Sequence, residues 1–270
     1  MSSRGTSAIA ALEHKLTRAA GKALGEFSMI DEGDRVMVAV SGGKDSYTML
    51  HVLRLMQRRA PVKFELVVVN IDQGHPGYPG HLLHDYMTRE KHDFHMIAED
   101  TYSIVKEKIP EGKTTCSLCS RLRRGILYRV ADELGCKKIA LGHHRDDVIQ
   151  TLMLNLIYAG KLSAMPAKLT ADSGRHQVIR PLVYCAEEDI QAFSDAMEFP
   201  ILPCNLCGSQ ENLQRKVVGQ MLDELEAKRP GTKTVMLSAL GNVEPTQLLD
   251  KELLSRLQAP AAKRGLPVVS

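Results

Sequence analysis

A short β-branched run is followed at once by a glycine-rich loop and then by an apolar helical pattern, and this order constrains the fold most. The run is RVMVAV at residues 35–40, the loop is SGGKDS at 41–46, and Leu50, Leu53 and Met56 follow at helical spacing. Adjacent glycines let the backbone turn tightly and bring N–H groups to an anion at the start of a helix. The segment therefore predicts a nucleotide-binding strand–loop–helix unit, with an ordinary strand–helix turn as the alternative.

The same alternation of strand-like and helix-like segments continues along the chain. Further strands are predicted at 64–71, 94–97, 138–141 and 178–183, and helices at 47–58, 81–92, 121–134 and around 148–156. Alternation of this kind predicts an α/β fold: a mostly parallel five-stranded sheet with helices on both faces. Ligands are then expected at the carboxyl ends of the strands.

The chain is predicted to consist of three regions. Residues 1–30 are expected to form an N-terminal amphipathic helix, because Ile9, Leu12 and Leu16 recur at helical spacing. Residues 31–185 form the nucleotide-binding α/β domain. Residues 186–270 are expected to form a helical C-terminal region that carries PCNLC at 203–207, with helices near 187–197, 209–228 and 246–257.

Charge and hydropathy limit the classes of partner. The chain has 35 Lys and Arg against 32 Asp and Glu, a net charge of +3, so a nucleic-acid partner, if there is one, must be bound by a local patch rather than by the overall charge. The absence of Trp, with only 5 Phe and 7 Tyr, favours phosphate and shape contacts over a stacking platform. No apolar run is long enough to span a bilayer and no secretory signal is recognised, which predicts a cytoplasmic protein without membrane contact.

A second motif, LGHHRDD at 141–147, falls at the predicted end of the fourth strand. Its two acids could simply complement a helix dipole, and its histidines and acids could form a hydrolytic metal site. The favoured interpretation is that Asp146 or Asp147 orients Mg²⁺ and the nucleotide. Asp45 is a further magnesium candidate, because a carboxylate beside phosphates is tolerable when Mg²⁺ stands between them.

Strand-end positions complete the predicted nucleotide site by analogy with other open α/β sheets. The expected nucleotide-binding residues are Ala39, Val40, Ser41, Gly42, Gly43, Lys44, Asp45, Ser46, Asp72, Gly142 and His143. Lys44, Asp45, Asp146 and Asp147 are the expected catalytic residues.

Four of the six cysteines form two Cys-x-x-Cys pairs, CSLC at 116–119 and CNLC at 204–207. Four thiolates would suit a structural zinc, three would suit a 4Fe-4S cluster with one open iron, and a redox disulfide is a third alternative. The spacing leaves these alternatives open. Cys136 and Cys185 have no such partner and are interpreted as packing thiols.

Taken in order, these motifs resemble a known family. SGGKDS resembles the PP-loop signature of the ATP pyrophosphatase superfamily, and the fold is expected to be adenine nucleotide alpha hydrolase-like. SGGKDS, CSLC with the arginines after it, GHHRDD and PCNLCGSQENLQR together resemble the tRNA 2-thiocytidine synthetase (TtcA) family. The resemblance runs from about residue 30 to about residue 245. It implies a 4Fe-4S cluster on Cys116, Cys119 and Cys207, with Cys204 as a possible further ligand.

The resemblance also implies the reaction. The C2 oxygen of cytidine 32 in the tRNA anticodon loop would be adenylated by ATP with Mg²⁺, and sulfur would then displace AMP to give 2-thiocytidine. A cysteine desulfurase or another sulfur donor is an expected partner, and a homodimer is possible. Alternatives are a 2-thiouridine-type thiolase of the same superfamily and a zinc-stabilised RNA-binding protein without turnover.

Cations near the predicted strand ends are candidates for binding the tRNA backbone. The main candidates are Arg121, Arg123, Arg124 and Lys161, and further ones are Arg129, Lys137, Lys138, Lys168, Arg175 and Arg180. Charges on a helix are commonly a solvated face, so about half of them are expected to have no such role.

Overall fold

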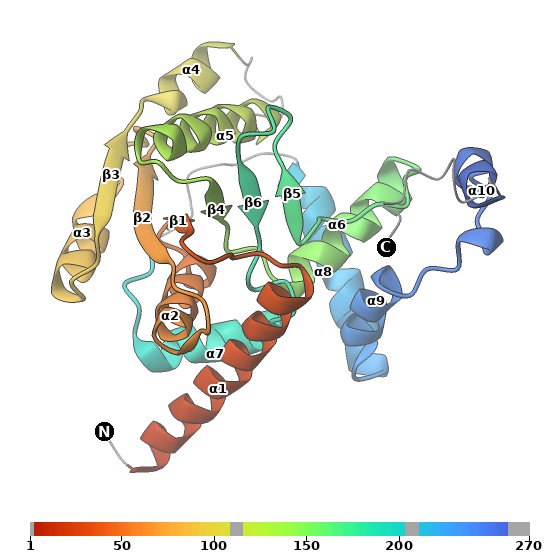
Figure 1. Cartoon of the computed structure of the whole chain (residues 1–270), viewed down its shortest axis with the longest axis horizontal. Coiled ribbons are helices and arrows are strands. Elements are labelled where there is room, and N and C mark those ends of the chain that lie inside the picture. The colour runs from red at the N-terminus through yellow and green to blue at the C-terminus, as the bar shows by residue number, and fades with distance from the viewer. Residues whose placement is uncertain (1–2, 109–115, 203–210, 259–270) are drawn as a thin grey trace.

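A computed structural model describes residues 3–108, 116–202 and 211–258 of the chain. Its centre is a sheet with the strand order β3-β2-β1-β4-β6-β5 (Figure 1). The strands are β1 (Arg35–Ala39), β2 (Glu65–Asp72), β3 (Phe94–Ala98), β4 (Lys138–Ala140), β5 (Lys168–Thr170) and β6 (Gln177–Ile179). All neighbours pair in parallel except β5 and β6. The predicted α/β class is therefore confirmed.

The predicted number of five strands is wrong, because a sixth strand, β5, pairs antiparallel with β6 at the edge of the sheet. Its sequence is Lys-Leu-Thr, which contains too few apolar residues to show a strand pattern. The strand predicted at 178–183 ends at Ile179 instead. Pro181 has no N–H for a ladder, and the apolar residues after it, Leu182 and Val183, are buried in the core without being in a strand.

Helices cover both faces of the sheet. They are α1 (Ser3–Glu26), α2 (Lys44–Arg59), α3 (Gly80–Arg89), α4 (Thr101–Lys108), α5 (Cys116–Glu133), α6 (Arg145–Tyr158), α7 (Glu187–Met197), α8 (Glu211–Lys228), α9 (Thr232–Leu240) and α10 (Lys251–Gln258), with a 3₁₀ turn at Pro245–Gln247. Helices α1, α2, α3 and α7 contribute to the core on one face, and α5 to the core on the other. The expected two-sided cover is therefore present.

Alternation along β1 produces these two cores. Val36 and Val38 join one core and Met37 joins the other, because successive strand side chains point to opposite faces. The predicted N-terminal helix packs into the first core through Leu16 and Ala20, both at most 1% exposed. Full burial of each large apolar side chain contributes about 1.5–3 kcal/mol, so α1 is an integral part of this layer.

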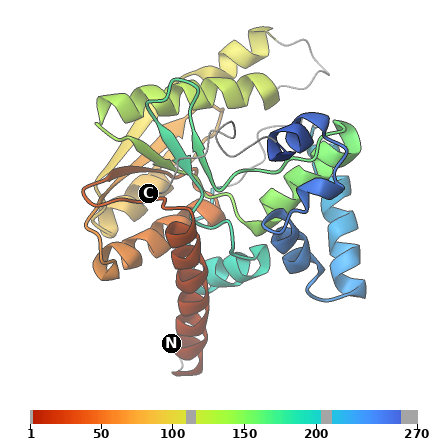
Figure 2. The ribbon, with the colours of Figure 1, turned by 45° about the vertical axis from the view of Figure 1, so that its right-hand side comes forward.

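Helices α6, α8 and α9 pack together beside the sheet, as the rotated view in Figure 2 shows. Ile149 of α6 meets Val218 and Leu222 of α8 in a small separate core. Neither α4 nor α9 was expected from the sequence. Unlike α8 and α9, which pack on α6, helix α7 packs on α1 and α2. Within the described ranges, no helix combines the length and apolar character needed to cross a membrane.

Candidate active site

The loop at residues 41–46 turns sharply between β1 and α2, at the carboxyl edge of the sheet. Gly42 has a φ of +86°, and a Cβ built there would lie 2.5 Å from the side chain of Leu202. The Leu202 N–H also donates to the Gly42 carbonyl at 2.9 Å. The hydroxyl of Ser46 donates to the Gly43 carbonyl at 2.8 Å and closes the turn. The loop therefore needs glycine at 42 and is held against the segment that leads to Pro203.

The first turn of α2 places Lys44 and Asp45 beside a third charged residue, Glu187, at the start of α7. Lys44 Nζ lies 3.2 Å from Asp45 Oδ1 and 3.1 Å from Glu187 Oε1. Burial alone would lower the pKa of Lys44, but Asp45 and Glu187 outweigh it and raise the pKa. The lysine is thus a firmly charged group at a helix N-terminus, where phosphate oxygens are favoured.

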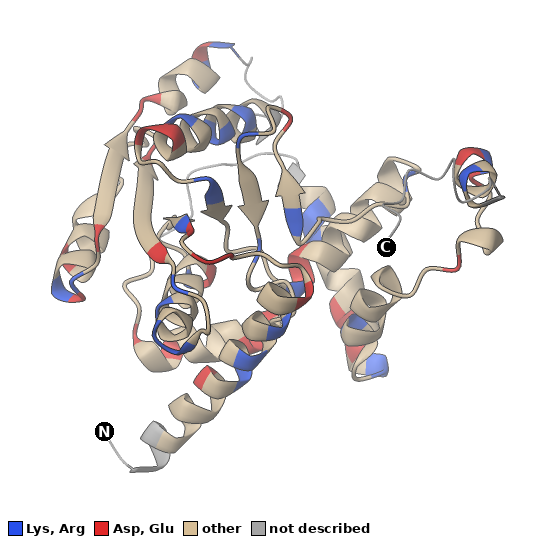
Figure 3. Ribbon diagram, in the orientation of Figure 1, with Lys and Arg blue, Asp and Glu red and all other residues tan. Residues whose placement is uncertain are grey.

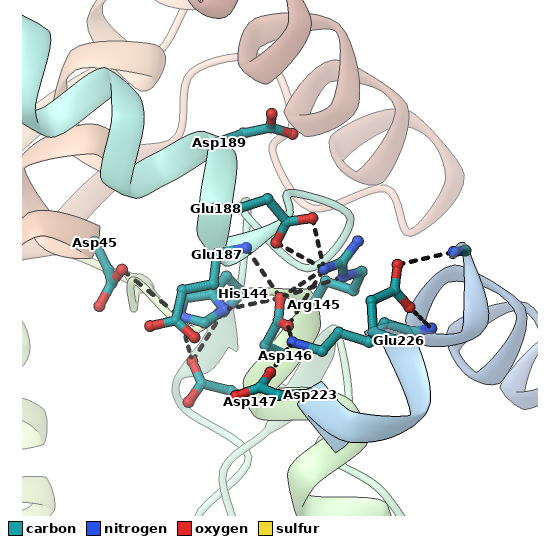
Figure 4. A network of polar contacts seen from close by, with 12 residues as sticks. Asp45, His144, Arg145, Asp146, Asp147, Glu187, Glu188, Asp189, Asp223 and Glu226 are labelled. Carbon is teal, nitrogen blue, oxygen red and sulfur yellow. Dashed lines mark hydrogen bonds and ion pairs between the residues drawn. The ribbon is translucent and has the colours of Figure 1, made fainter. Parts of the chain in front are cut away.

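The GHHRDD motif packs directly on this loop. A Cβ at Gly142 would lie 3.1 Å from the carbonyl carbon of Asp45 and 3.2 Å from the backbone nitrogen of Ser46. His144 Nε2 lies 3.6 Å from Asp45 Oδ1 and 3.5 Å from Asp147 Oδ2. Figure 4 shows Asp45 and Asp147 each joined to His144 by a dashed line. The tertiary structure thus brings together two predicted motifs that are about 100 residues apart in the sequence.

Gly142→Ala tests this close approach. The added methyl would press on the backbone of the phosphate loop, so we expect at least ten-fold weaker ATP binding and a loss of about 1–3 kcal/mol in the free energy of unfolding. Calorimetric ATP binding and chemical denaturation measure the two effects. Gly25→Ala in α1 is the control, because its Cβ meets no atom within 4 Å among the described residues. Unchanged ATP affinity in Gly142→Ala would contradict the packing argument.

Asp146 differs from Asp147, the other acid of the motif. The Asp146 side chain is only 1% exposed, and its carboxylate is surrounded by protein donors. Oδ2 accepts from the Glu187 N–H at 2.9 Å and from Arg145 Nε at 3.2 Å, and Oδ1 lies 3.1 Å from Lys233 Nζ. Burial would raise the pKa of Asp146, but the Glu187 N–H and Arg145 outweigh it and lower the pKa. Asp146 therefore joins α6, α7 and α9. Figure 4 shows it between Arg145 and Glu187.

His143 is held by a neighbouring arginine. Arg180 Nε donates to His143 Nδ1 at 3.3 Å, and Arg180 also donates to the Pro166 carbonyl at 2.6 Å. Burial first, and then the charge of Arg180, lower the pKa of His143 to about 4. The imidazole is therefore neutral at pH 7, and because Nδ1 accepts, its proton sits on Nε2.

This depressed pKa predicts how stability depends on pH. Between about pH 6.5 and 4 the unfolded chain binds a proton on His143 that the folded chain does not, so the free energy of unfolding falls as the pH drops through this window. The loss should approach about 3 kcal/mol, since one pKa unit corresponds to about 1.4 kcal/mol. Chemical denaturation of His143→Asn at several pH values should show that its free energy of unfolding depends less steeply on pH than that of the parent chain. A dependence equal to that of the parent chain would be inconsistent with a neutral buried histidine.

Of the predicted cluster ligands, only the Cys119 side chain lies within the described part. It is partly buried near the start of α5, and its Sγ lies 3.3 Å from Oε1 of Gln73, the residue that follows β2. Cys204 and Cys207 lie outside the described residues, as does the side chain of Cys116. Cys136 and Cys185 are buried free thiols, as expected for packing cysteines, and burial raises the pKa of each.

The remaining nucleotide-site candidates surround the loop. Ala39 ends β1 and Val40 follows it, and the Val40 carbonyl accepts from the buried Asn70 side chain at 2.8 Å. Asp72 ends β2, and its Oδ1 accepts the Gly74 N–H at 2.9 Å. Ser41, which begins the loop, is exposed. These strand ends form the side of the site expected to face the adenosine.

The RNA-binding candidates separate into two groups. Arg121, Arg123 and Arg124 are exposed on α5, whose basic stretch is visible in Figure 3, and Lys161 is exposed after α6. The prediction that Lys138 binds RNA is wrong, because its side chain is buried at 4% exposure and pairs with Asp31 and Asp34. Others are occupied by the protein, namely Arg129 by Glu99 and Glu133, Arg175 by Asp132, Lys168 by the Ser28 carbonyl, and Arg180 as described above. Lys137 is exposed.

The sequence reasoning missed Glu187, Lys233 and the role of Arg145. Glu187 is an acid in the first turn of a helix, a position that ordinarily needs no explanation beyond the helix dipole. Lys233 lies in a helix that was not predicted, and its ion pair with Asp146 spans 87 residues of chain (233 minus 146). Arg145 belongs to the motif, but its bonds to Asp146 and Glu188 depend on tertiary packing.

Comparison with known proteins agrees with this geometry. Residues 12–200 match the PP-loop domain family. Proteins named tRNA-cytidine(32) 2-sulfurtransferase are 63% identical in Sorangium cellulosum (93% of this chain, 89% of that protein) and 57% identical in Pseudomonas paraeruginosa (96% of each). The U34-tRNA thiolase NcsA from Methanococcus maripaludis, solved with its [4Fe-4S] cluster, shares the fold with a TM-score of 0.68 and 24% identity, over 87% of this chain and 80% of that one. The chain therefore belongs to the PP-loop domain family and, within it, to the family of the tRNA-cytidine(32) 2-sulfurtransferases.

Proposed function

We propose that the chain is an ATP-dependent tRNA sulfurtransferase that converts cytidine 32 into 2-thiocytidine. The observation that carries this proposal is the convergence of three motifs at one edge of the sheet. The phosphate loop, the GHHRDD motif and Cys119 lie beyond the carboxyl ends of β1, β4 and β2 respectively. The names of the relatives that match nearly the whole chain supply the target nucleotide.

The phosphate loop is suited to the first half-reaction. The C2 oxygen of cytosine would attack the α-phosphorus of ATP, pyrophosphate would leave, and AMP would be joined to the base through that oxygen. The first-turn N–H groups of α2 and the Lys44 ammonium offer positive charge to the phosphates. Lys44 Nζ forms ion pairs with Asp45 and Glu187. When ATP binds, its phosphates would replace Glu187 as a partner of the ammonium.

Magnesium fits beside Asp45 and Asp147. Asp45 Oδ1 is buried, and its contacts are ion pairs with Lys44 Nζ at 3.2 Å and His144 Nε2 at 3.6 Å. Asp147 Oδ2 lies 3.5 Å from the same nitrogen of His144. Carboxylate oxygens are the ligands that Mg²⁺ prefers, and the ion would neutralise phosphate charge there. Asp146 is already occupied by Arg145, Lys233 and a backbone N–H, so we assign it to positioning the motif rather than to the metal.

A 4Fe-4S cluster fits the cysteine set. Cys119 is partly buried at the same edge, and Cys207 follows Leu202, which is hydrogen-bonded to the phosphate loop, by only five residues (207 minus 202). With Cys116, Cys119 and Cys207 as ligands, the cluster would supply an open iron position for the incoming sulfur.

The second half-reaction replaces oxygen by sulfur. Sulfur at the level of hydrosulfide attacks C2 of the adenylated base, its proton is released and AMP leaves with the oxygen, so one ATP is converted to AMP and pyrophosphate per sulfur inserted. A cysteine desulfurase together with a thiol reductant, which supplies the two electrons that convert persulfide sulfur to hydrosulfide, or another donor would provide the sulfur. Arg121, Arg123 and Arg124 on α5, at the end of the helix that carries Cys119, are proposed to bind the tRNA backbone. A homodimer and a cytoplasmic location stay predictions.

Nucleoside mass spectrometry of tRNA from cells that lack the protein tests this function. We expect 2-thiocytidine to be absent and other thiolated nucleosides to be unchanged, and we expect the parent gene to restore 2-thiocytidine. Loss of 2-thiouridine with retention of 2-thiocytidine would contradict the proposal and favour a thiolase for a different base.

A further inference from the structure

We propose that Gln73 is a positioning residue for the cluster: its side-chain amide donates a hydrogen bond to the sulfur of Cys119 and raises the reduction potential of the bound cluster. The inference rests on the proposed function, in which Cys119 is a cluster ligand. It adds a residue that belongs to none of the three motifs.

The contact joins two elements at the carboxyl edge of the sheet. Gln73 follows Asp72, the last residue of β2, and Cys119 lies at the start of α5. Their side chains meet at 3.3 Å between Oε1 and Sγ, and both residues are partly buried. A sulfur contact of this length is within hydrogen-bond range, so the side chain of Gln73 lies directly against the sulfur.

Gln73 is held in place by its own surroundings. Its backbone carbonyl accepts the Tyr102 N–H at 3.0 Å, and its Oε1 accepts from the Thr101 hydroxyl, at the start of α4, at 3.5 Å. The next residue, Gly74, has a φ of +76°, and a Cβ there would lie 3.0 Å from Asp100. The backbone of Gln73 is therefore positioned by β2 and α4 and does not depend on the cysteine. A hydroxyl can also accept, so Thr101 suits either orientation of the terminal amide.

The chemistry of the amide suits a ligand sulfur. A free thiol can donate to Oε1, but an iron-bound sulfur is an acceptor only. The amide carries two N–H donors beside its oxygen, and a half-turn of the terminal group presents one of them at the same place. Hydrogen bonds to the sulfurs stabilise the more negative, reduced cluster, and they are one of the terms that set its potential.

The test uses the full chain with its cluster reconstituted without oxygen, and it measures the midpoint potential of the cluster by absorbance during a redox titration. Gln73→Leu, which removes the donors, is expected to shift the potential to a more negative value. Gln73→Glu, which has the same shape but only acceptors, is expected to shift it further and to lose iron in air several-fold faster. If Gln73→Leu holds no iron, the midpoint potential is measured in Gln73→Asn instead. This variant keeps an amide but places it one methylene further from the Cys119 sulfur.

Gln57→Leu is the matched control. Gln57 is in α2, and its amide donates to the Phe64 carbonyl at 2.8 Å, away from the cysteines. Its substitution should leave the potential unchanged. Potentials equal to that of the parent chain in both Gln73→Leu and Gln73→Glu would overturn the inference and leave the proposed function standing. A parent chain that binds no iron under these conditions would overturn the proposed function itself.

Discussion

Asp45→Ala is expected to lower ATP-dependent thiolation of tRNA by about 100-fold or more, because the variant lacks the carboxylate that would bind Mg²⁺ beside the phosphates. Asp45 Oδ1 is buried and lies 3.2 Å from Lys44 Nζ and 3.6 Å from His144 Nε2. In phosphoryl transfer, positioning and charge neutralisation supply most of the catalysis. The measurement is 2-thiocytidine formed per enzyme in a single-turnover assay with excess ATP.

The iron content of Asp45→Ala should equal that of the parent chain, because Asp45 is in α2 and none of the proposed cluster ligands belongs to that helix. Asp189→Ala is the matched control. Asp189 is also a first-turn acid, but it pairs with Lys15 of α1 and points away from the network in Figure 4. Full thiolation by Asp45→Ala would rule out the proposed role in magnesium binding.

Cys119→Ser is expected to abolish thiolation and to remove most of the iron from protein prepared without oxygen. The parent protein should be brown, with about four irons per chain. Loss of one of three thiolates leaves too few ligands for a stable cluster, whereas the phosphate loop is unaffected. ATP binding should therefore persist. Iron analysis, the visible spectrum and calorimetric ATP binding provide the three readouts.

The buried thiols are the controls for this experiment. Cys136→Ala and Cys185→Ala should keep both iron and activity, because these side chains are buried and the pKa of each thiol is raised. Cys204→Ser separates two kinds of site: a cluster held by Cys116, Cys119 and Cys207 survives the change, whereas a four-thiolate zinc site does not. A colourless parent protein with stoichiometric zinc would contradict the cluster.

The parts of the fold that depend on local patterns were predictable. Strand β1, the glycine turn and α2 follow from β-branched residues, adjacent glycines and helical spacing within about 25 residues. Helix α7 was predicted at its observed bounds, 187–197, because its apolar residues Ile190 and Phe193 recur on one face. Strand β5 and helix α9 were missed, since a three-residue edge strand carries little signal and α9 buries no residue fully.

Sequence alone determined which chemical groups the protein possesses: a phosphate loop, paired acids, and two cysteine pairs whose order matches one family. Only the tertiary structure decided how these groups are used. It buried Asp146 among backbone and side-chain donors and placed Asp45 Oδ1 between the cationic or ring nitrogens of Lys44 and His144. It also set Lys44 against Glu187 and Cys119 against Gln73. The physical reason is that burial, ion pairing and donor geometry depend on helices that are remote in sequence but adjacent in space, and a linear pattern does not encode those distances.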